Sequence, residues 1–261
     1  DDKKFGRYWP ADLHLVGKDI IKFHCALWPA MLMSADIPLP KQVFAHGFFT
    51  INGDKMSKSL GNAIDPKLIA EEYGIDVVRY FLLREITFGE DGDFSVDRLR
   101  QRYSGELANE LGNLLHRTLS MTDKYFDGKV PTMTAETDPN DRGWEAYEEG
   151  LEKLDFAKAL DAIWDIIRAS NKFIEDRKPW ELAKTDKDAL GKVIYLLLER
   201  LRHVAWMLAP IAPEIARKMF VQLGRPDELS EGSYDEAKVW GGMRENDTIA
   251  KGEPLFPHLE E

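Results

Sequence analysis

The pattern of apolar and polar positions divides the chain into two parts. Up to residue 51, two short apolar runs typical of β-strands, 13–16 and 43–51, flank an apolar stretch with helical character at 19–34. The order strand–helix–strand predicts a piece of a parallel α/β sheet. Because Pro29 lies inside the 19–34 stretch, the helix there is expected to kink.

From residue 65 onward the pattern is helical. Asp65, as an N-cap before Pro66, predicts the start of one helix, and Asp76 is expected to cap a second. Apolar spacing of three and four residues predicts further helices near residue 95 and at 105–126, 144–153, 155–177, 187–209 and 212–223. Polar segments rich in Gly and Pro predict loops at 87–95, 131–143 and 224–261. The second part is therefore predicted to be an antiparallel helical bundle.

Composition narrows the class of protein. The chain has 261 residues, 44% of them hydrophobic and 31% charged, which is typical of a soluble protein with one large or two ordinary domains. No uncharged apolar run reaches the roughly 18 residues of a transmembrane helix, so no membrane span is expected. The only cysteine, Cys25, allows no intrachain disulfide and no cysteine-cluster zinc site. A reducing compartment, the cytoplasm or an organellar matrix, fits this composition.

Charge limits how the chain could bind nucleic acid. The formal net charge is −11, of which residues 1–100 contribute −2 and the remainder −9. This argues against a broad surface that coats phosphates, and any nucleic acid should be held by a few local contacts. The chain starts with neither Met nor the apolar core of a signal peptide. We therefore expect it to be a piece of a larger protein.

The segment INGDKMSKSLGN, residues 51–62, carries the main candidate chemistry. Asn52-Gly53 is a strong turn signal after the strand, so the two lysines that follow lie on a loop between a strand and a helix. Loops of this kind commonly bind phosphate. Flexible ammonium groups stabilise negative charge on a departing phosphate group, and serine hydroxyls can donate hydrogen bonds to it. A solvated basic turn is the alternative interpretation.

Four blocks of sequence carry a resemblance to a known family. Residues 55–59 match the KMSKS loop of class I aminoacyl-tRNA synthetases at all five positions. HLVGKDIIKFH, WPAMLMSADIPLPKQVFAHGF and LGNAIDP…YGIDVVRYFLLRE surround it in an order similar to that of the methionyl-tRNA synthetases. The resemblance implies an α/β fold followed by an all-α one. Residues 1–62 would be the second half of a Rossmann-type nucleotide-binding domain ending in the KMSKS loop, 63–103 the connecting helices, and 104–261 an α-helical-bundle anticodon-binding domain.

The same resemblance implies the roles of individual residues in the α/β part. Lys55 and Lys58 would be catalytic, and the residues expected to bind ATP are Lys55, Met56, Ser57, Lys58, Ser59, Gly17, Asp19, His46 and Gly47. His24 would contact methionine. Three alternatives remain open from the residues alone: Asp19 as a helix cap, His24 as a core histidine, and His46-Gly47 as a turn that ends a strand.

The other motif of the family, HIGH, is absent, because none of the six histidines stands in such a setting. In the family this motif and a zinc-bearing insertion lie in the first half of the nucleotide-binding domain. The resemblance therefore implies that an N-terminal half of the catalytic domain is missing here. By itself the chain is expected to be inactive and to contain no zinc site.

In the helical part, the helix at 105–126 has two faces. Leu107, Leu111, Leu114 and Thr118 form an apolar stripe, and Asn109, Asn113 and Arg117 form a polar stripe that should face outward. The resemblance implies that Asn113 and Arg117 read the anticodon and that Trp180, held after Pro179, stacks on one of its bases. A solvated helix face and a tryptophan that closes the end of the bundle are the alternatives.

The function expected from the resemblance is that of a methionine–tRNA ligase. Its substrates would be methionine, ATP with Mg²⁺, and tRNA(Met). Another class I aminoacyl-tRNA synthetase of the same subclass, for leucine, valine, isoleucine or cysteine, is one alternative. A non-catalytic tRNA-binding helical module is the other, although such a module has no use for a KMSKS loop.

Overall fold

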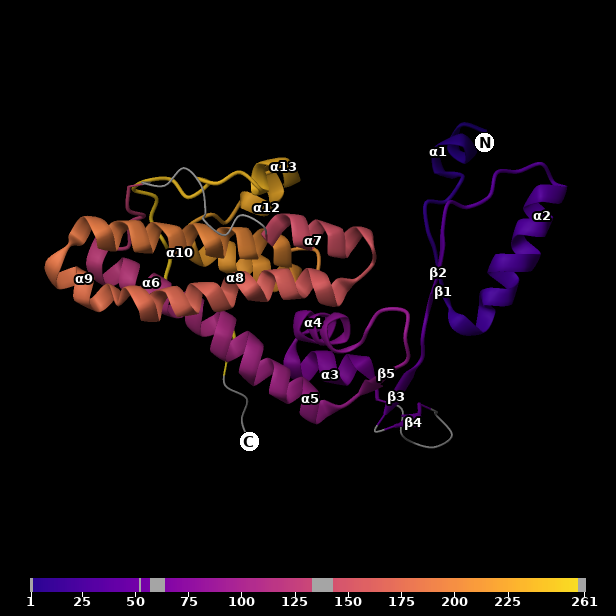
Figure 1. The fold of residues 1–261 in the computed structure, drawn as a ribbon, viewed down its shortest axis with the longest axis horizontal. Helices are drawn as coiled ribbons and strands as arrows, with labels where there is room; N and C mark the ends of the chain where they lie inside the picture. Colours follow the sequence, from indigo (N-terminus) through magenta and orange to yellow (C-terminus); the bar gives the residue numbers. More distant parts are fainter. Residues whose placement is uncertain (1, 52, 57–63, 133–142, 258–261) are drawn as a thin grey trace. The chain divides into compact units, whose positions relative to one another are not determined.

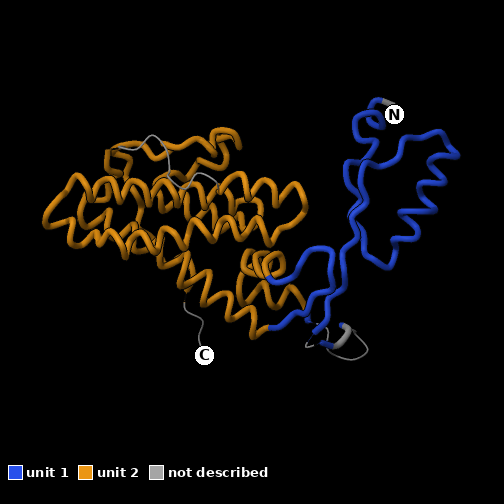
Figure 2. Tube along the Cα trace, in the orientation of Figure 1, with its two compact units in different colours: residues 1–64, 85–95 blue, residues 65–84, 96–261 orange. Residues whose placement is uncertain are grey.

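A computed structural model describes residues 2–51, 53–56, 64–132 and 143–257. Packing divides the chain into two compact units, shown in Figure 2: unit 1 comprises residues 1–64 and 85–95, and unit 2 comprises 65–84 and 96–261. The division of the chain at residues 62 and 103 rests on the resemblance and stays a prediction.

Unit 1 contains two small sheets (Figure 1). In the first, β1 (His14–Gly17) pairs in parallel with β2 (Val43–His46), with Gly17 opposite His46. In the second, β3 (Phe49–Ile51) lies between β4 (Asp54–Lys55), which is antiparallel to it, and β5 (Gly92–Phe94), which is parallel. The predicted parallel α/β unit is confirmed by the β1–β2 pair.

The helical stretch between β1 and β2 changes geometry along its length. A 3₁₀ turn (Lys18–Ile20) and a π-helical segment (Phe23–Leu27) precede α2 (Trp28–Ser34). Pro29 has no N–H and cannot take part in the regular hydrogen-bond ladder, so the backbone departs from α geometry in the turn before it. The irregularity expected at this proline therefore takes the form of a π-helical segment.

The single strand predicted at 43–51 is wrong, because it is interrupted after His46. A side chain at Gly47 would overlap the backbone of Glu90, and the N–H of Phe48 is donated to Asp91 instead of to a neighbouring strand. The loop predicted at 87–95 is also wrong in part, since it contains β5. Pairing with a distant strand, and not local propensity, defines both features.

Unit 2 is the helical bundle that the pattern predicted. Its helices are α3 (Pro66–Tyr73), α4 (Ile75–Glu85), α5 (Val96–Arg102), α6 (Asn113–Phe126), α7 (Gly143–Glu152), α8 (Phe156–Arg177), α9 (Pro179–Thr185), α10 (Lys187–Leu208), α11 (Pro213–Gln222), α12 (Glu228–Glu231) and α13 (Tyr234–Ala237). Local caps start the predicted helices: Asp65, Asp155 and Asp186 each accept a backbone N–H of the first turn.

The centre of unit 2 is α10, which is buried on nearly all sides. α6, α8 and α11 pack against it, and α7 packs on α8. The central helix also buries polar side chains, among them Glu199, Arg202 and His203. Trp144 and Trp164 are core residues, and the indole N–H of Trp144 is donated to His203 Nδ1 at 2.7 Å.

Two expectations about helix boundaries are wrong. Residues 96–126 form one uninterrupted helical segment, because a ten-residue π-helical stretch (Tyr103–Gly112) joins α5 to α6. A glycine costs only about 1 kcal/mol in a helix, so Gly105 is no barrier where packing favours continuity. Asp76 does not cap its own helix: its Oδ2 accepts the backbone N–H of Ile215, in the first turn of α11.

Candidate functional site

The carboxyl ends of β1 and β2 bring together four predicted ATP-binding residues. Gly17 and His46 are direct neighbours in the strand pairing, and Asp19 follows in the 3₁₀ turn. A Cβ at Gly17 would stand 2.6 Å from Asp19 Oδ1 and 3.9 Å from His46 Cε1. His46 Nδ1 lies 2.9 Å from the carbonyl oxygen of Gly47. Because a carbonyl only accepts, Nδ1 carries the proton, and Nε2 of the neutral ring is left as an acceptor.

This arrangement suits a phosphate or nucleoside ligand. Ligands of open parallel sheets bind beyond the carboxyl ends of the strands. The absence of a side chain at Gly17 leaves room for the Asp19 carboxylate beside the strand end, whereas the Cβ position of Gly47 is filled by the backbone of Glu90. The geometry is compatible with the ATP contacts expected from the sequence, and the individual roles of these residues remain predictions.

An ion pair next to this edge was missed at the sequence level. Lys18 Nζ lies 2.6 Å from both carboxylate oxygens of Asp91, and Asp91 Oδ1 also accepts the N–H of Phe48 at 2.8 Å. The hydrogen bond from Lys18, followed by that from Phe48, lowers the pKa of the Asp91 carboxyl below its ordinary value. Asp91 therefore joins the start of the 3₁₀ turn to the segment between β2 and β3.

The KMSKS segment begins on a tight hairpin. β3 and β4 pair so that Thr50 faces Lys55 and Ile51 faces Asp54, and Gly53 has a φ of 83°. The turn expected from Asn52-Gly53 is therefore confirmed by the strand pairing around it. Lys55 ends β4 and Met56 is half-buried, whereas Ser57, Lys58 and Ser59 lie outside the described residues, as does the side chain of Lys55.

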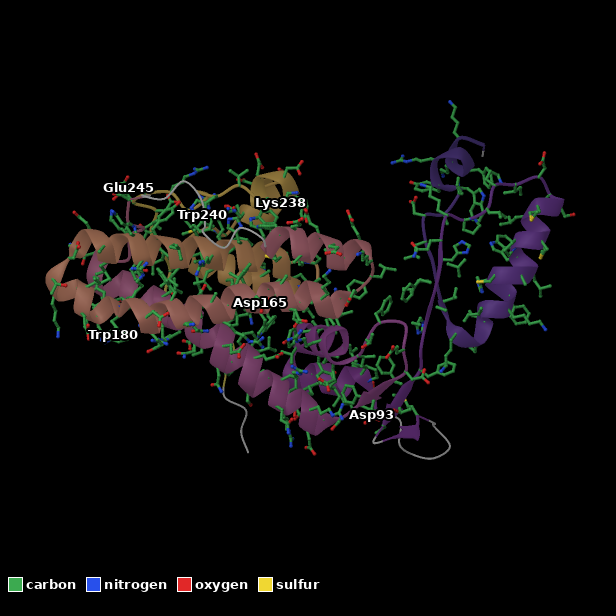
Figure 3. The ribbon with its side chains drawn as sticks, viewed as in Figure 1. Asp93, Asp165, Trp180, Lys238, Trp240 and Glu245 are labelled. Atoms are coloured by element: carbon green, nitrogen blue, oxygen red, sulfur yellow. The ribbon has the colours of Figure 1, made fainter. Side chains whose placement is uncertain are left out.

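The hairpin is fastened to β5 by Asp93, a second residue that the sequence pattern did not single out. Asp93 Oδ1 accepts the hydroxyl of Thr50 at 2.7 Å and the backbone N–H of Gly53 at 2.8 Å. Asp93 is labelled in Figure 3. The available signal is the alternation in Asp91-Gly-Asp93-Phe, which is typical of a short strand.

His24 is not part of the group around Gly17. Its ring lies 6.1 Å from that of His14, at the opposite end of β1 and about 10 Å along the strand from Gly17. His24 Nδ1 is 3.1 Å from the carbonyl oxygen of Ile20. Aromatic side chains surround this position: Trp9 contacts both His14 and Trp28.

Two buried polar atoms in this aromatic cluster lack a hydrogen-bond partner among the residues that the structure describes. They are His14 Nδ1 and Trp28 Nε1. Buried donors and acceptors in proteins are nearly always satisfied, so each such atom calls for an explanation. A bound polar molecule would satisfy them. The surroundings of His24 are thus compatible with a substrate pocket, and its methionine contact remains a prediction.

The predicted anticodon residues lie on the surface of unit 2. The apolar stripe of the 105–126 helix is fully buried, as predicted, while Asn109 and Asn113 are exposed. Arg117 is held in place, because its Nη2 lies 2.7 Å from Glu175 Oε1 in the last turn of α8. This pair connects the polar stripe of α6 to the end of α8, where the chain turns toward Trp180.

Trp180 stands on a rigid corner. α8 ends at Arg177, the C-cap residue Lys178 adopts a left-handed conformation (φ 46°), and the buried Pro179 starts α9. Trp180 is 40% exposed, and Figure 3 shows it at the α9 end of the bundle. An indole fixed by its backbone and open to solvent is suited to stack on an unpaired base. Its role stays a prediction, but it does not close the end of the bundle as a buried residue would.

The described residues were also surveyed for metal sites and membrane spans. Within the ranges given above, no three His, Cys, Asp or Glu side chains are grouped so that they could hold a metal ion. None of the helices in those ranges is both long and apolar enough to traverse a bilayer.

Comparison with known families places both parts of the chain. Residues 1–119 match the family described as tRNA synthetases class I (M). This part of the chain is therefore of the class I aminoacyl-tRNA synthetase type. Residues 129–261 match the anticodon binding domain of methionyl tRNA ligase. The chain belongs to the methionyl-tRNA ligase family. The resemblance noted in the KMSKS segment and its flanking blocks is thereby confirmed.

Individual relatives agree with this placement. The chain is 44% identical over 269 residues to the methionine–tRNA ligase of Caldanaerobacter subterraneus subsp. tengcongensis and 45% identical over 268 residues to that of Thermotoga maritima. In both cases the match covers 100% of this chain and 42% of the relative. The chain thus spans less than half the length of these relatives.

Solved structures show the same fold. The Mycobacterium tuberculosis methionyl-tRNA synthetase bound by methionyl-adenylate superposes with a TM-score of 0.89 at 40% identity, covering 97% of this chain and 51% of that one. Its free form gives a TM-score of 0.88. The predicted order, an α/β catalytic-type part followed by a helical anticodon-binding domain, is confirmed.

Proposed function

We propose that this chain provides part of the catalytic site and the anticodon-binding domain of a methionine–tRNA ligase. The protein would activate methionine with ATP and transfer the methionyl group to tRNA(Met). The observation that carries the proposal is the convergence of Gly17, Asp19 and His46 at the carboxyl ends of two parallel strands. A fragment that only bound tRNA would not need this nucleotide-type edge, nor a KMSKS segment on a fastened hairpin.

In the first step, a carboxylate oxygen of methionine attacks the α-phosphorus of ATP. The bond from that phosphorus to the bridging oxygen breaks, and pyrophosphate leaves with the electron pair. Lys55 and Lys58 would stabilise the charge on pyrophosphate, and Ser57 and Ser59 would donate hydrogen bonds. Mg²⁺ would enter with ATP, bound mainly through phosphate oxygens. In the second step, a ribose hydroxyl of the tRNA terminus attacks the methionyl carbonyl carbon and AMP leaves.

The sheet edge would bind the nucleoside part of ATP. Asp19, next to the end of β1, offers acceptors for ribose hydroxyls. His46, whose Nδ1 proton is engaged by the carbonyl of Gly47, would present Nε2 as an acceptor to the exocyclic amine of adenine. The aromatic cluster around His24 would hold the methionine side chain, since thioethers pack favourably against aromatic rings.

The exposed end of the bundle would read the anticodon. Asn113 offers a donor and an acceptor, Arg117 a planar group held by Glu175, and Trp180 a fixed stacking surface.

The chain has a single, exposed cysteine, so its fold needs no intrachain disulfide. This suits a reducing compartment, and we place the protein in the cytoplasm.

The activation step is tested in the full-length protein by methionine-dependent pyrophosphate exchange. Lys58→Ala should slow exchange by roughly 10²- to 10³-fold, the effect of removing one donor that stabilises a developing anion. The affinity of the Lys58→Ala variant for methionine should stay within twofold of that of the unaltered protein. Lys67→Ala, which removes an exposed lysine of α3, is the matched control and should change neither value. An unchanged exchange rate in the Lys58 variant would contradict the role of the loop.

The same assay addresses the 261-residue chain by itself. We expect no methionyl-adenylate from it, because its sequence contains no HIGH motif. Measurable exchange by this chain would show that the catalytic residues have been misassigned.

The anticodon role of the bundle is tested by titrating an anticodon stem-loop of tRNA(Met). Trp180→Ala should weaken binding by about 1–3 kcal/mol, the contribution of one base–aromatic stack, whereas pyrophosphate exchange should not change. Trp180→Phe should recover part of the loss. Binding should depend weakly on salt, since few phosphate contacts are expected. Equal binding by the wild-type and alanine variants would refute the stacking role.

A further inference from the structure

The hairpin that leads into the KMSKS segment is too small to hold its shape by itself. β4 has two residues and β3 has three, and the connecting turn needs a positive φ at Gly53. An isolated two-stranded hairpin is marginally stable at best in water, even when it is longer than this one. The position of Lys55, the last residue of β4, therefore depends on contacts made from outside the hairpin.

One carboxylate oxygen supplies two such contacts. Asp93 Oδ1 accepts the Thr50 hydroxyl from β3 and the Gly53 N–H from the turn, at 2.7 and 2.8 Å. Asp93 lies opposite Thr50 in the parallel β3–β5 pairing, and Thr50 lies opposite Lys55 in the antiparallel β3–β4 pairing. Asp93, Thr50 and Lys55 thus occupy neighbouring positions across three strands, and the aspartate fixes both the first strand and the turn.

The half-buried setting of Asp93 strengthens these hydrogen bonds. Its neighbours along β5, Gly92 and Phe94, are buried, and hydrogen bonds to a charged acceptor are stronger than those between neutral groups. A second anchor operates next to it, since Asp91 accepts the N–H of Phe48 just before β3. The β5 segment thus holds the hairpin from its start to its turn.

We infer that Asp93 is a positioning residue for amino-acid activation: it fixes the register and aim of the hairpin so that the KMSKS lysines reach the phosphates. This rests on the proposed function. A group that loses its alignment by about 1 Å can cost a reaction up to about 100-fold in rate without touching the substrate itself. Asp93 acts through Thr50 and Gly53, so its removal should affect the chemical step more than methionine binding.

The test uses methionine-dependent pyrophosphate exchange in the full-length protein, with kcat and the KM values for methionine and ATP measured separately. Asp93→Ala should lower kcat by about 10- to 100-fold and leave the KM for methionine within twofold. Asp93→Asn keeps an oxygen that can accept both hydrogen bonds and should recover most of the rate. Glu90→Ala removes an exposed carboxylate from the same segment and is the control, so activity should not change.

Thr50 provides a second, milder route to the same contact. Thr50→Val removes the hydroxyl and keeps the shape, whereas Thr50→Ser keeps the hydroxyl. Valine at this position should lower kcat, and serine should not. This pair keeps the inference testable if Asp93→Ala does not fold, which thermal unfolding would reveal.

A double variant decides whether Asp93 acts through the loop. If it does, the combined loss in Asp93→Ala/Lys58→Ala should be smaller than the product of the two single losses, because misalignment cannot matter for an absent ammonium group. Fully multiplicative losses, or an unchanged rate in Asp93→Ala, would overturn the inference. Equal losses in Asp93→Ala and Asp93→Asn would overturn it as well. Absence of exchange in the unaltered protein would instead refute the proposed function.

Discussion

The buried carboxylate of Glu199 ties the C-terminal tail to the central helix of the bundle. Its Oε2 accepts the N–H of Met243 at 2.8 Å, and its Oε1 accepts those of Gly241 and Gly242 at 2.9 Å. Arg202, itself almost fully buried, donates to the same Oε1 at 2.8 Å. A single charged group of α10 thus organises a tail that contains little regular structure.

The neighbouring His203 contacts three partners. Trp144 donates its indole N–H to Nδ1, and Nε2 lies 3.0 Å from Arg202 Nη2 and 3.3 Å from Glu199 Oε1. Burial raises the pKa of Glu199, but the hydrogen bond from His203 and the charge of Arg202 outweigh this and lower it to about 2. The carboxylate therefore stays charged in the folded protein at neutral pH.

The first prediction concerns this carboxylate. Because its pKa is lower in the folded than in the unfolded chain, the stability that it contributes is present above pH 4.5 and is lost as the pH falls toward 2. Glu199→Gln should lower the free energy of unfolding of the bundle by about 3 kcal/mol at pH 7 and flatten its pH dependence between pH 4.5 and 2. Urea unfolding across this pH range measures both effects.

Glu214→Gln is the matched control, since Glu214 pairs with Arg217 on the exposed surface of α11. It should leave stability nearly unchanged, because solvent screens an exposed ion pair. Equal effects of the two substitutions would show that the buried network around Glu199 contributes no more than a surface pair.

Single residues also show where sequence reasoning succeeded and where it failed. Gly17 and Asp19 were placed at the end of a strand from the sequence, and His46 was suggested by the family resemblance. The parallel pairing brings Gly17 next to His46, while the ATP-binding roles of these residues stay predictions. Asp91 and Asp93 were missed, since their meaning depends on partners roughly 40 and 70 residues away in the chain. Local sequence gives no sign of such contacts, whereas the strand pairing makes them obvious.

At the scale of elements, local signals predicted the long helices well. α8 and α10 start at aspartates that cap them. α8 carries an apolar stripe that matches its buried face, and α10 is buried on nearly all sides. The short strand β5 was not predicted, because three residues between glycines and aspartates form a strand only when a partner strand is present. The helix at 212–223 was predicted from its apolar spacing, but its cap could not be, because the cap comes from α4.

The second prediction concerns this cap between helices. Ala212, at the N-cap position of α11, has no side-chain acceptor, and Asp76 Oδ2 on α4 replaces it at 2.8 Å from the N–H of Ile215. Asp76→Ala should lower the free energy of unfolding by about 1 kcal/mol, the usual effect of losing an N-cap, and should speed amide exchange at Ile215. Asp76→Asn keeps an acceptor and should preserve slow exchange there. Unchanged exchange at Ile215 in the alanine variant would contradict the role of Asp76 as a cap.

At the scale of the whole molecule, the two compact units differ in how much apolar surface they bury. Among the described residues, the buried hydrophobic side chains of unit 1 are Val16, Leu32, Ile51 and Phe94, whereas those of unit 2 fill the interior between α6, α8, α10 and α11. Unit 1 also exposes large apolar side chains, namely Phe5, Tyr8, Leu15, Ile21, Phe23, Leu27, Met31, Met33, Leu39, Phe48 and Phe49. Burial of apolar surface is the main stabilising term in folding, so the units should differ in stability.

The last prediction follows from this difference. In the 261-residue chain, amide hydrogen exchange should show unit 1 opening at a lower free energy than unit 2, as two separate cooperative units. Leu198→Ala, in the core of α10, should lower the opening free energy of unit 2 by about 2–5 kcal/mol and leave that of unit 1 unchanged. Val16→Ala, in β1, is the reciprocal substitution and should affect unit 1 alone. The division into two units would be contradicted if both showed the same opening free energy and either substitution reduced it equally. The small sheets of unit 1 would then depend for their stability on the core of the bundle.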